Sequence, residues 1–363
     1  MASIDTVGAI TLDQLQLAAR NHGLPLEALA YPITPIGLHY LLIHYDIPAV
    51  DAESWRLTVD GDVRQPLSLS LEELRARPAV EVAATMECAG NGRATLAPPV
   101  DSQPWLNEAV GTGAWRGARL RDVLDDAGIG DGAAEVLFSG LDRGVEDEVE
   151  QSYQRSLPLD EALRDEVLLA YELNGMPLPP QHGFPLRMLV PGWYGMTSVK
   201  WLERITVLDA PFEGVQMAKR YRLQRDEDDP GTPLTRMLPR ALAIPPGVPE
   251  FHSRERFLAA GLCVLRGRAW SGWAPISEVG VSVDGGATWE EARIERDVDS
   301  AWAWCAWTYE WQGEPGRYEL AFRARDEAGN EQPLEGEWNV GGYGNNAVHR
   351  VIVNVGSGLS RHP

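Results

Sequence analysis

The last third of the sequence consists of short runs in which apolar and polar residues alternate, separated by turn residues. The runs are LCVLRGRAWSG, VGVSVDGGATW, AWAWCAWTYEW, RYELAFRARDEAGN and RVIVNV. Because successive side chains of a strand point to opposite faces of a sheet, this pattern predicts antiparallel strands with one buried face. Five such runs within about 110–120 residues are typical of an immunoglobulin-like β-sandwich. We therefore predict such a domain over residues 235–363, after a charged, Pro-containing linker at 225–240.

The preceding part of the chain mixes helical and strand patterns. Residues 1–37 are predicted to form an N-terminal helical segment, because Thr11 and Gln14 have the spacing of a capping box. Residues 38–234 are predicted to form a mixed α/β domain, so the whole chain belongs to the α+β class. Within these parts we expect helices at 11–20, 69–78 and 117–128, strands at 39–48, 55–63, 136–142 and 167–175, and a turn at 111–117.

The charge and hydropathy of the chain exclude several classes of partner. Its 53 acidic and 32 basic residues give a net charge of −21, which argues against a nucleic-acid partner because phosphate neutralisation needs clustered positive charge. No apolar run approaches the roughly 20 residues that span a bilayer, so no membrane interaction is expected. The N-terminus, MASID, carries no export signal. We therefore expect a cytoplasmic protein, or a periplasmic one if a signal was removed.

Three cysteines, Cys88, Cys263 and Cys305, do not form a disulfide framework, and no CxxC or CxxCH motif occurs. Cys88 lies in the segment MECAGNGR (86–93), where glycines permit tight turns after a predicted strand. A thiolate at this place would be a nucleophile or a ligand for a soft metal. The alternative is a buried free cysteine without a chemical role, although Gly-Asn-Gly-Arg is poor core material.

A second candidate segment is HGFPLRMLVPGWYGMTSVKWL (182–202). Its three potential cations, His182, Arg187 and Lys200, are interleaved with Pro and Gly, which indicates loops that face one pocket. Arg offers bidentate geometry and Lys a point charge, a combination that suits a phosphate. Lys200 is also one of only two lysines in the chain. The alternative is a set of surface cations around Pro-rich turns.

Together these segments resemble the sulfite oxidase family of molybdenum enzymes. CAGNGR resembles the cysteine loop of that family, and the stretch from LLAYELNG to SVKWL resembles its pterin-binding segment. RAWSG, SVDGGATW and NNAVHRVIV resemble its C-terminal domain. The resemblance implies a molybdopterin-binding domain followed by an immunoglobulin-like dimerisation domain. It therefore implies a homodimer with one molybdenum-molybdopterin per chain and no haem.

The resemblance also implies roles for individual residues. Cys88 matches the thiolate that ligates molybdenum, and Arg93 matches an arginine that faces the oxyanion substrate. Trp115 and Tyr221 match a tryptophan and a tyrosine of the substrate pocket. The implied cofactor-binding positions are His44, Tyr45, Asp46, Cys88, Asp142, His182, Arg187, Ser198, Val199 and Lys200. We expect Cys88, Arg93 and Tyr221 to take part in catalysis.

Two positions depart from the family pattern. The Arg-Asn-His of the family is replaced by His44-Tyr45-Asp46, and the arginine expected after a Trp-Asn pair is replaced by Gly341. Two of three anion-binding arginines are thus absent, and each charged hydrogen bond contributes about 1.5–3 kcal/mol. We expect a substrate pocket with little fixed positive charge, in which Arg93 binds the oxyanion and a protonated His44 assists.

The resemblance implies oxidation of sulfite to sulfate by oxygen-atom transfer at a Cys-ligated molybdenum-pterin. Electrons would pass to oxygen or to a separate cytochrome. A basic cytochrome would be attracted electrostatically by this acidic protein. A reductase of nitrate or of a sulfoxide on the same cofactor is the main alternative. Nitrate reductases of the family tend to carry asparagine where this chain has Tyr221, which favours the oxidase. A thiol hydrolase that uses Cys88 with His182, and a partner-binding protein with a vestigial site, are more remote alternatives.

Overall fold

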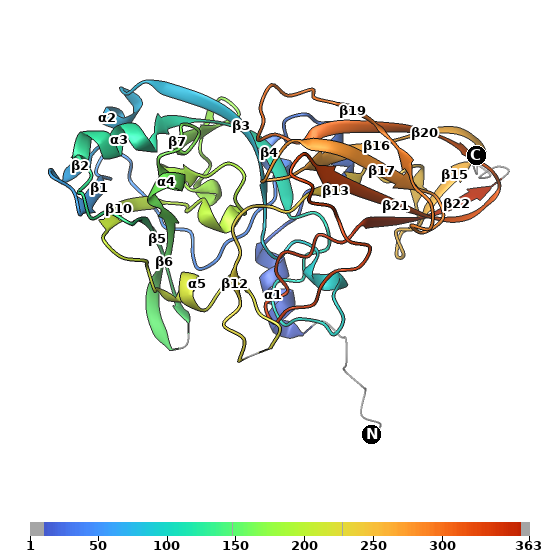
Figure 1. Cartoon of the computed structure of the whole chain (residues 1–363), viewed down its shortest axis with the longest axis horizontal. Coiled ribbons are helices and arrows are strands. Elements are labelled where there is room, and N and C mark those ends of the chain that lie inside the picture. The colour runs from blue at the N-terminus through green and yellow to red at the C-terminus, as the bar shows by residue number, and fades with distance from the viewer. Residues whose placement is uncertain (1–10, 147, 227, 357–363) are drawn as a thin grey trace.

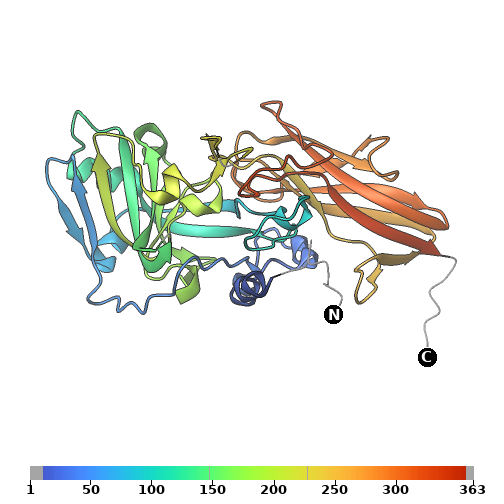
Figure 2. The same ribbon diagram turned by 90° about the horizontal axis from the view of Figure 1, so that it is seen from below.

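Two β-rich lobes lie side by side along the long axis of the molecule (Figure 1). The computed structural model describes residues 11–146, 148–226 and 228–356. The view from below shows the same two lobes, with the helix nearest the N-terminus under their junction (Figure 2). Among the described residues, no helix is long and apolar enough to cross a membrane.

The first sheet of the N-terminal lobe has the strand order β2-β1-β10-β5-β6. Its strands are β1 (Leu57–Gly61), β2 (Leu67–Leu69), β5 (Glu135–Glu146), β6 (Val149–Pro158) and β10 (Leu202–Leu208). β1 and β10 pair in parallel, whereas the other neighbours are antiparallel. Apolar residues such as Val59, Phe138 and Ile205 are fully buried in the core of this lobe. The strands predicted from the alternation at 55–63 and 136–142 are confirmed.

The second sheet has the order β3-β4-β7-β8, and β9 pairs with β7. Its strands are β3 (Ala79–Glu87), β4 (Val110–Arg119), β7 (Leu168–Leu173), β8 (Met176–Pro177) and β9 (Arg187–Leu189). The predicted turn at 111–117 is wrong, since these residues form the middle of β4. Glycines hide the alternation there because a neighbouring strand comes very close. A Cβ at Gly117 would lie 2.1 Å from the carbonyl oxygen of Leu169.

Short helices connect the strands. They are α1 (Leu12–Arg20), α2 (Leu71–Arg75), α3 (Leu120–Ala127), α4 (Leu159–Ala162) and α5 (Val215–Ala218), with 3-10 turns η1 (Leu26–Ala30), η2 (Ile36–Leu38), η3 (Arg93–Thr95), η4 (Pro180–His182) and η5 (Gly195–Thr197). α1 begins with a capping box in which the Thr11 hydroxyl accepts the amide N–H of Gln14 at 3.1 Å. Ser70 and Glu73 form the same motif at the start of α2. α3 ends at Gly128, whose φ of +69° is the left-handed conformation that favours glycine. The three predicted helices are therefore confirmed, with shorter bounds.

The predicted strand at 39–48 is wrong, because this segment is irregular. Its backbone groups are used by other parts of the chain. Leu41 forms an isolated bridge with His22, and the carbonyl of Leu42 accepts a hydrogen bond from Lys200 Nζ at 2.6 Å. Its apolar side chains face a cavity and the adjoining core instead of a sheet.

The C-terminal lobe is a β-sandwich, as predicted. One sheet has the order β13-β16-β20-β19 and the other β14-β15-β22-β21-β17-β18. The strands are β13 (Arg240–Ala243), β14 (Val248–Pro249), β15 (Arg256–Ala259), β16 (Gly261–Trp270), β17 (Ile276–Ser282), β18 (Glu290–Glu291), β19 (Arg293–Glu295), β20 (Cys305–Gly313), β21 (Gly316–Asp326) and β22 (His349–Gly356), with a small hairpin of β11 (Arg222–Leu223) and β12 (Thr232–Pro233) before them. Alternate residues such as Val279, Trp307 and Phe322 are fully buried between the sheets.

The segment before residue 38 and the two lobes share one buried apolar cluster. Leu24 and Leu29 come from that segment, Tyr194 from the N-terminal lobe, and Trp270 and Trp304 from the sandwich. Buried contacts of this cluster cross both predicted domain boundaries. The exact positions of these boundaries stay predictions. The cluster places the loops of the N-terminal lobe directly against the sandwich.

Candidate active site

A cavity of about 660 Å³, its open mouth included, lies in the N-terminal lobe where β3 ends. Loop residues around η4 and η5 and the irregular segment at 39–44 form its walls. Nine of the predicted site residues line it: His44, Cys88, Asp142, His182, Arg187, Ser198, Val199, Lys200 and Tyr221. The two candidate segments of the sequence therefore meet in one place.

Cys88 follows directly after β3, and its backbone is fixed by a hydrogen bond from its amide to the carbonyl of Ala109 at 2.9 Å. The residue is 7% exposed. Burial raises the pKa of the Cys88 thiol, while the amide of Gly90, the charge of Arg93 and the indole of Trp105 act in the opposite direction. A metal ion at this sulfur would favour the thiolate, because a coordinating thiol is deprotonated.

Arg187 forms the cationic floor of the cavity. Its Nη1 donates to the carbonyl of His182 and its Nη2 to the carbonyl of Ser198, both at 3.0 Å. The guanidinium also lies 4.8 Å from the ring centroid of Trp115. These partners are neutral, and burial lowers the pKa of Arg187 to about 10. The charge of Arg187 is therefore held in a fixed position, and no carboxylate of the described residues pairs with it.

Lys200, Asp142 and His182 complete this end of the cavity. Lys200 Nζ lies 4.3 Å from the ring centroid of Trp201. Burial lowers the pKa of Lys200 to about 7 and raises that of Asp142 to about 7. Burial, together with nearby positive charge, also lowers the pKa of His182 to about 2. Asp142 Oδ1 is buried and has no hydrogen-bond partner within the described part of the chain. Such a concentration of desolvated groups suits a bound anion that also carries hydrogen-bond donors.

Tyr221 and His44 also line the cavity. His44 Nε2 lies 3.5 Å from Glu146 Oε1, and this contact is the main reason that the pKa of Glu146 falls to about 2. Glu146 Oε2 also lies 3.3 Å from Nε of Arg220, so one carboxylate contacts two basic side chains here. Tyr45 and Asp46 do not line the cavity. The Tyr45 hydroxyl donates to Glu146 at 3.0 Å, and Asp46 accepts a backbone amide of β5 at 3.0 Å.

Arg93 and Trp115 also lie outside the cavity lining, although the resemblance implies that both face the substrate. Arg93 Nε donates to the carbonyl of Gly341 at 2.9 Å, and its guanidinium lies 5.0 Å from the ring centroid of Tyr343. Trp115 is fully buried in β4 beneath Arg187. Trp115 therefore contacts Arg187 from outside the cavity lining, and its role in a substrate pocket stays a prediction.

Three further residues of the site were missed from the sequence. His39 and Tyr153 line the cavity, and the ring centroid of His39 lies 5.7 Å from that of His182. Trp105 acts on the thiol of Cys88. The apolar run after His39 gave a weak signal for that residue, whereas Tyr153 lies among polar residues that gave none. No local pattern marks Trp105, because its loop reaches Cys88 only in the folded chain.

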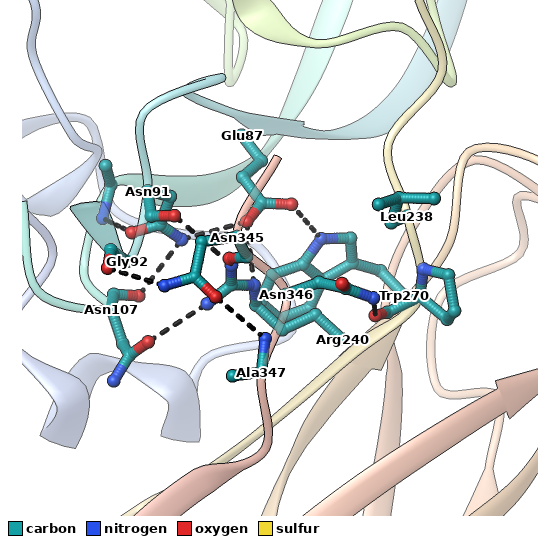
Figure 3. Close-up of polar contacts among 12 residues, drawn as sticks. Glu87, Asn91, Gly92, Asn107, Leu238, Arg240, Trp270, Asn345, Asn346 and Ala347 are labelled. Atoms are coloured by element: carbon teal, nitrogen blue, oxygen red, sulfur yellow. Dashed lines mark hydrogen bonds and ion pairs between the residues drawn. The ribbon is translucent and has the colours of Figure 1, made fainter. Parts of the chain in front are cut away.

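Glu87, the residue before Cys88, links the two lobes (Figure 3). Its Oε1 lies 2.8 Å from Nε of Arg240 on β13, and both side chains are at most 2% exposed. Glu87 also accepts the indole N–H of Trp270 and the amide N–H of Asn91, each at 2.9 Å. A carboxylate this deeply buried needs such partners. The network therefore fixes the loop that carries Cys88 against the sandwich.

Comparisons with known families match most of the chain. The model of the oxidoreductase molybdopterin binding domain matches residues 44–216, and that of the Mo-co oxidoreductase dimerisation domain matches residues 252–356. Sulfite oxidase of Gallus gallus is 39% identical over 345 residues, which cover 90% of this chain and 74% of the relative. Mitochondrial sulfite oxidase of Mus musculus is 37% identical over 339 residues, 89% of this chain and 62% of the relative.

A nitrate reductase [NAD(P)H] of Hordeum vulgare is 35% identical over 351 residues, which cover 89% of this chain and 39% of that relative. The chain thus spans only part of the length of these relatives. Among solved structures, the sulfane dehydrogenase SoxCD from Paracoccus pantotrophus superposes with a TM-score of 0.78 at 24% identity, over 98% of this chain and 95% of that chain. This similarity concerns the fold, and it agrees with a mixed α/β domain followed by a β-sandwich. The family matches and the extent of identity show that this chain belongs to the sulfite oxidase family of molybdopterin-dependent oxidoreductases.

Proposed function

We propose that this protein oxidises sulfite to sulfate by oxygen-atom transfer at a molybdenum-molybdopterin bound through Cys88. The observation that carries the proposal is that one cavity contains the Cys88 thiol, the buried cations of Arg187 and Lys200, and the phenol of Tyr221. Sulfite oxidases with 36–39% identity over about nine-tenths of the chain support the choice of substrate.

The residues in the cavity fit a molybdopterin. Its phosphate is an anion, and Arg187 and Lys200 offer buried positive charge. Asp142 Oδ1, which lacks a partner among the described residues, offers an acceptor for a pterin N–H. Cys88 offers the soft thiolate that suits molybdenum next to dithiolene sulfurs. When bound, the group supplies two-electron oxygen-atom transfer chemistry, which no side chain can supply.

The residues of this chain would bind and orient the reactants. Arg187 is already fixed by the carbonyls of His182 and Ser198, so little entropy is lost when a phosphate binds. His182 and Lys200 would donate to the same phosphate. Tyr221, which also lines the cavity, would orient the oxyanion through its O–H.

The partners follow from the same assignments. The match to a dimerisation domain supports a homodimer, and the charge of −21 favours a basic cytochrome as external electron acceptor, with oxygen as the alternative. The absence of haem and the cytoplasmic or periplasmic location stay predictions.

Two measurements test the proposed function. Purified protein should contain about one molybdenum per chain, and it should reduce ferricyanide or oxygen when sulfite is added. Nitrate should be tested with an artificial electron donor, because nitrate reductases are also relatives at 35% identity. Molybdenum-loaded protein that reduces nitrate but leaves sulfite unchanged would contradict sulfite oxidation. Protein that binds no molybdenum would favour the hydrolase or the vestigial site.

Arg187→Ala and Lys200→Ala are each expected to weaken cofactor binding by about 10- to 100-fold, because a charged hydrogen bond contributes about 1.5–3 kcal/mol. The melting temperature should fall together with the pterin content, since a bound cofactor stabilises the fold by mass action. Pterin fluorescence and thermal unfolding check both effects. Lys219→Ala, which changes the other lysine outside this cavity, is the control. Full pterin content and unchanged melting of both variants would show that the cations do not hold the phosphate.

Glu146→Gln is expected to lower the KM for sulfite by about two- to fivefold, the size of a partly exposed ion pair. The change removes the carboxylate that contacts both His44 and Arg220, so these basic side chains would be less neutralised near the substrate. Steady-state kinetics of the variant and of the wild type check this effect. Glu150→Gln, at an exposed pair with Arg143 on the neighbouring strand, is the control. An unchanged KM would mean that Glu146 does not reduce the positive charge available to the substrate.

A further inference from the structure

Arg155 is a buried arginine that none of the roles above uses. It lies on β6 opposite Phe138 of β5 and is 2% exposed. Its Nη1 donates to the carbonyl of Gln216, but its Nε has no hydrogen-bond partner in the described part of the chain. The groups that act on its charge are tyrosines instead of carboxylates. Burying a guanidinium in this position costs folding free energy, because the charge is desolvated. Such a buried charge points to a role in the folded protein.

Arg155 ends a row of stacked cationic and aromatic groups. Its Cζ lies 5.2 Å from the ring centroid of Tyr221, and the rings of Tyr221 and Tyr343 are 5.0 Å apart. Arg93 lies 5.0 Å from the centroid of Tyr343 on the far side of the row. Two guanidinium groups therefore flank one pair of tyrosines, in the geometry of cation–π contacts. Tyr221 is the member of this row that lines the cavity.

The backbone of Tyr221 is strained. Its φ of +55° lies in the left-handed region, which is unfavourable for an aromatic residue. Such a conformation persists only where the surroundings fix it. The carbonyl of Tyr221 accepts the amide of Leu234 at 2.9 Å, and Arg155 and Tyr343 hold its ring from two sides. Arg155 is therefore part of what places this phenol at the cavity.

Other basic residues also lie near Tyr221. Lys219 and Arg220 line an adjoining pocket with Tyr221, and Arg220 and His44 both pair with Glu146. We propose that Arg155 is a positioning residue for the oxyanion, which acts by holding the phenol of Tyr221 in place. The identity of the oxyanion rests on the proposed function. The guanidinium does not line the cavity, so it acts through the ring of Tyr221.

Arg155→Met and Arg155→Lys test this role in the molybdenum-loaded protein. Methionine keeps much of the side-chain length and removes the charge, whereas lysine keeps the charge but loses the planar fork. The affinity for inorganic sulfate is measured by titration calorimetry, and kcat and KM are measured with sulfite. Arg256→Met is the matched control, because Arg256 is also buried and bonds to backbone carbonyls, but lies in the sandwich on β15.

We expect Arg155→Met to weaken sulfate binding and raise the KM for sulfite by about 10- to 100-fold, with molybdenum and pterin content unchanged. In Arg155→Lys the sulfate affinity should fall and the KM for sulfite should rise by about three- to tenfold, because the charge remains but its geometry differs. If Arg155→Met does not accumulate as folded protein, the lysine variant alone decides. The proposal would be overturned if the Arg155 variant binds sulfate with wild-type affinity and has the wild-type KM. An equal loss of sulfate affinity in Arg256→Met would also overturn it. If wild-type protein oxidises no sulfite, the proposed function fails, while the sulfate titration still tests Arg155.

Discussion

Replacing Cys88 by serine is expected to lower kcat for sulfite by more than about 100-fold. Mutating a residue that only supports a metal ligand already lowers metal affinity or activity by about 10- to 100-fold. Serine offers a hard, weakly acidic hydroxyl in place of a soft thiolate. Pterin content should stay near the wild-type level, because the proposed phosphate contacts of Arg187 and Lys200 do not involve the Cys88 sulfur. Turnover and pterin content of one preparation check both expectations.

Cys305→Ser is the matched control for this experiment. Cys305 is also a buried free cysteine, but it lies on β20 in the sandwich. Its replacement should leave kcat unchanged. Near-native turnover of Cys88→Ser would contradict the role of this thiol as the metal ligand.

Glu87→Gln is expected to reduce the free energy of unfolding by about 3–5 kcal/mol, the usual cost of removing one partner from a buried ion pair. Trp270 donates to Oε2 and Asn91 to Oε1, so the single oxygen of glutamine can accept from only one of them. The loss therefore combines one unpaired donor with the uncompensated charge of Arg240. Because the pair joins the Cys88 loop to the sandwich (Figure 3), the two lobes should also unfold less cooperatively. Denaturant unfolding followed by tryptophan fluorescence checks both effects.

A double-mutant cycle gives the control for this pair. Glu87→Gln combined with Arg240→Met should recover much of the stability, because the second change removes the uncompensated charge. Glu319→Gln, at a partly exposed pair with Arg350, should cost no more than about 1 kcal/mol. If Glu87→Gln also lowers the free energy of unfolding by no more than about 1 kcal/mol, the structural role of the buried pair is contradicted.

Local patterns predicted the elements whose stability is local. The capping boxes at Thr11 and Ser70 each satisfy a backbone amide within three residues, so the sequence is sufficient to identify them. The strands of the sandwich were visible because one face of each is buried. The same reasoning failed for β4, where glycines replace side chains, and for 39–48, where apolar residues line a cavity.

The sequence alone determined the fold class, and it marked Cys88, His182, Arg187 and Lys200 as site candidates, because they lie in short segments with unusual residue types. Only the tertiary structure decided how the charges at the substrate end are paired. Arg93 reaches a carbonyl 248 positions away, and Tyr45 reaches Glu146 across 101 positions. Such contacts join segments that no period or spacing connects, so their energies exist only once the sheets and lobes have packed. The electrostatics of the substrate pocket is therefore a property of the fold, whereas its ligating atoms are a property of the sequence.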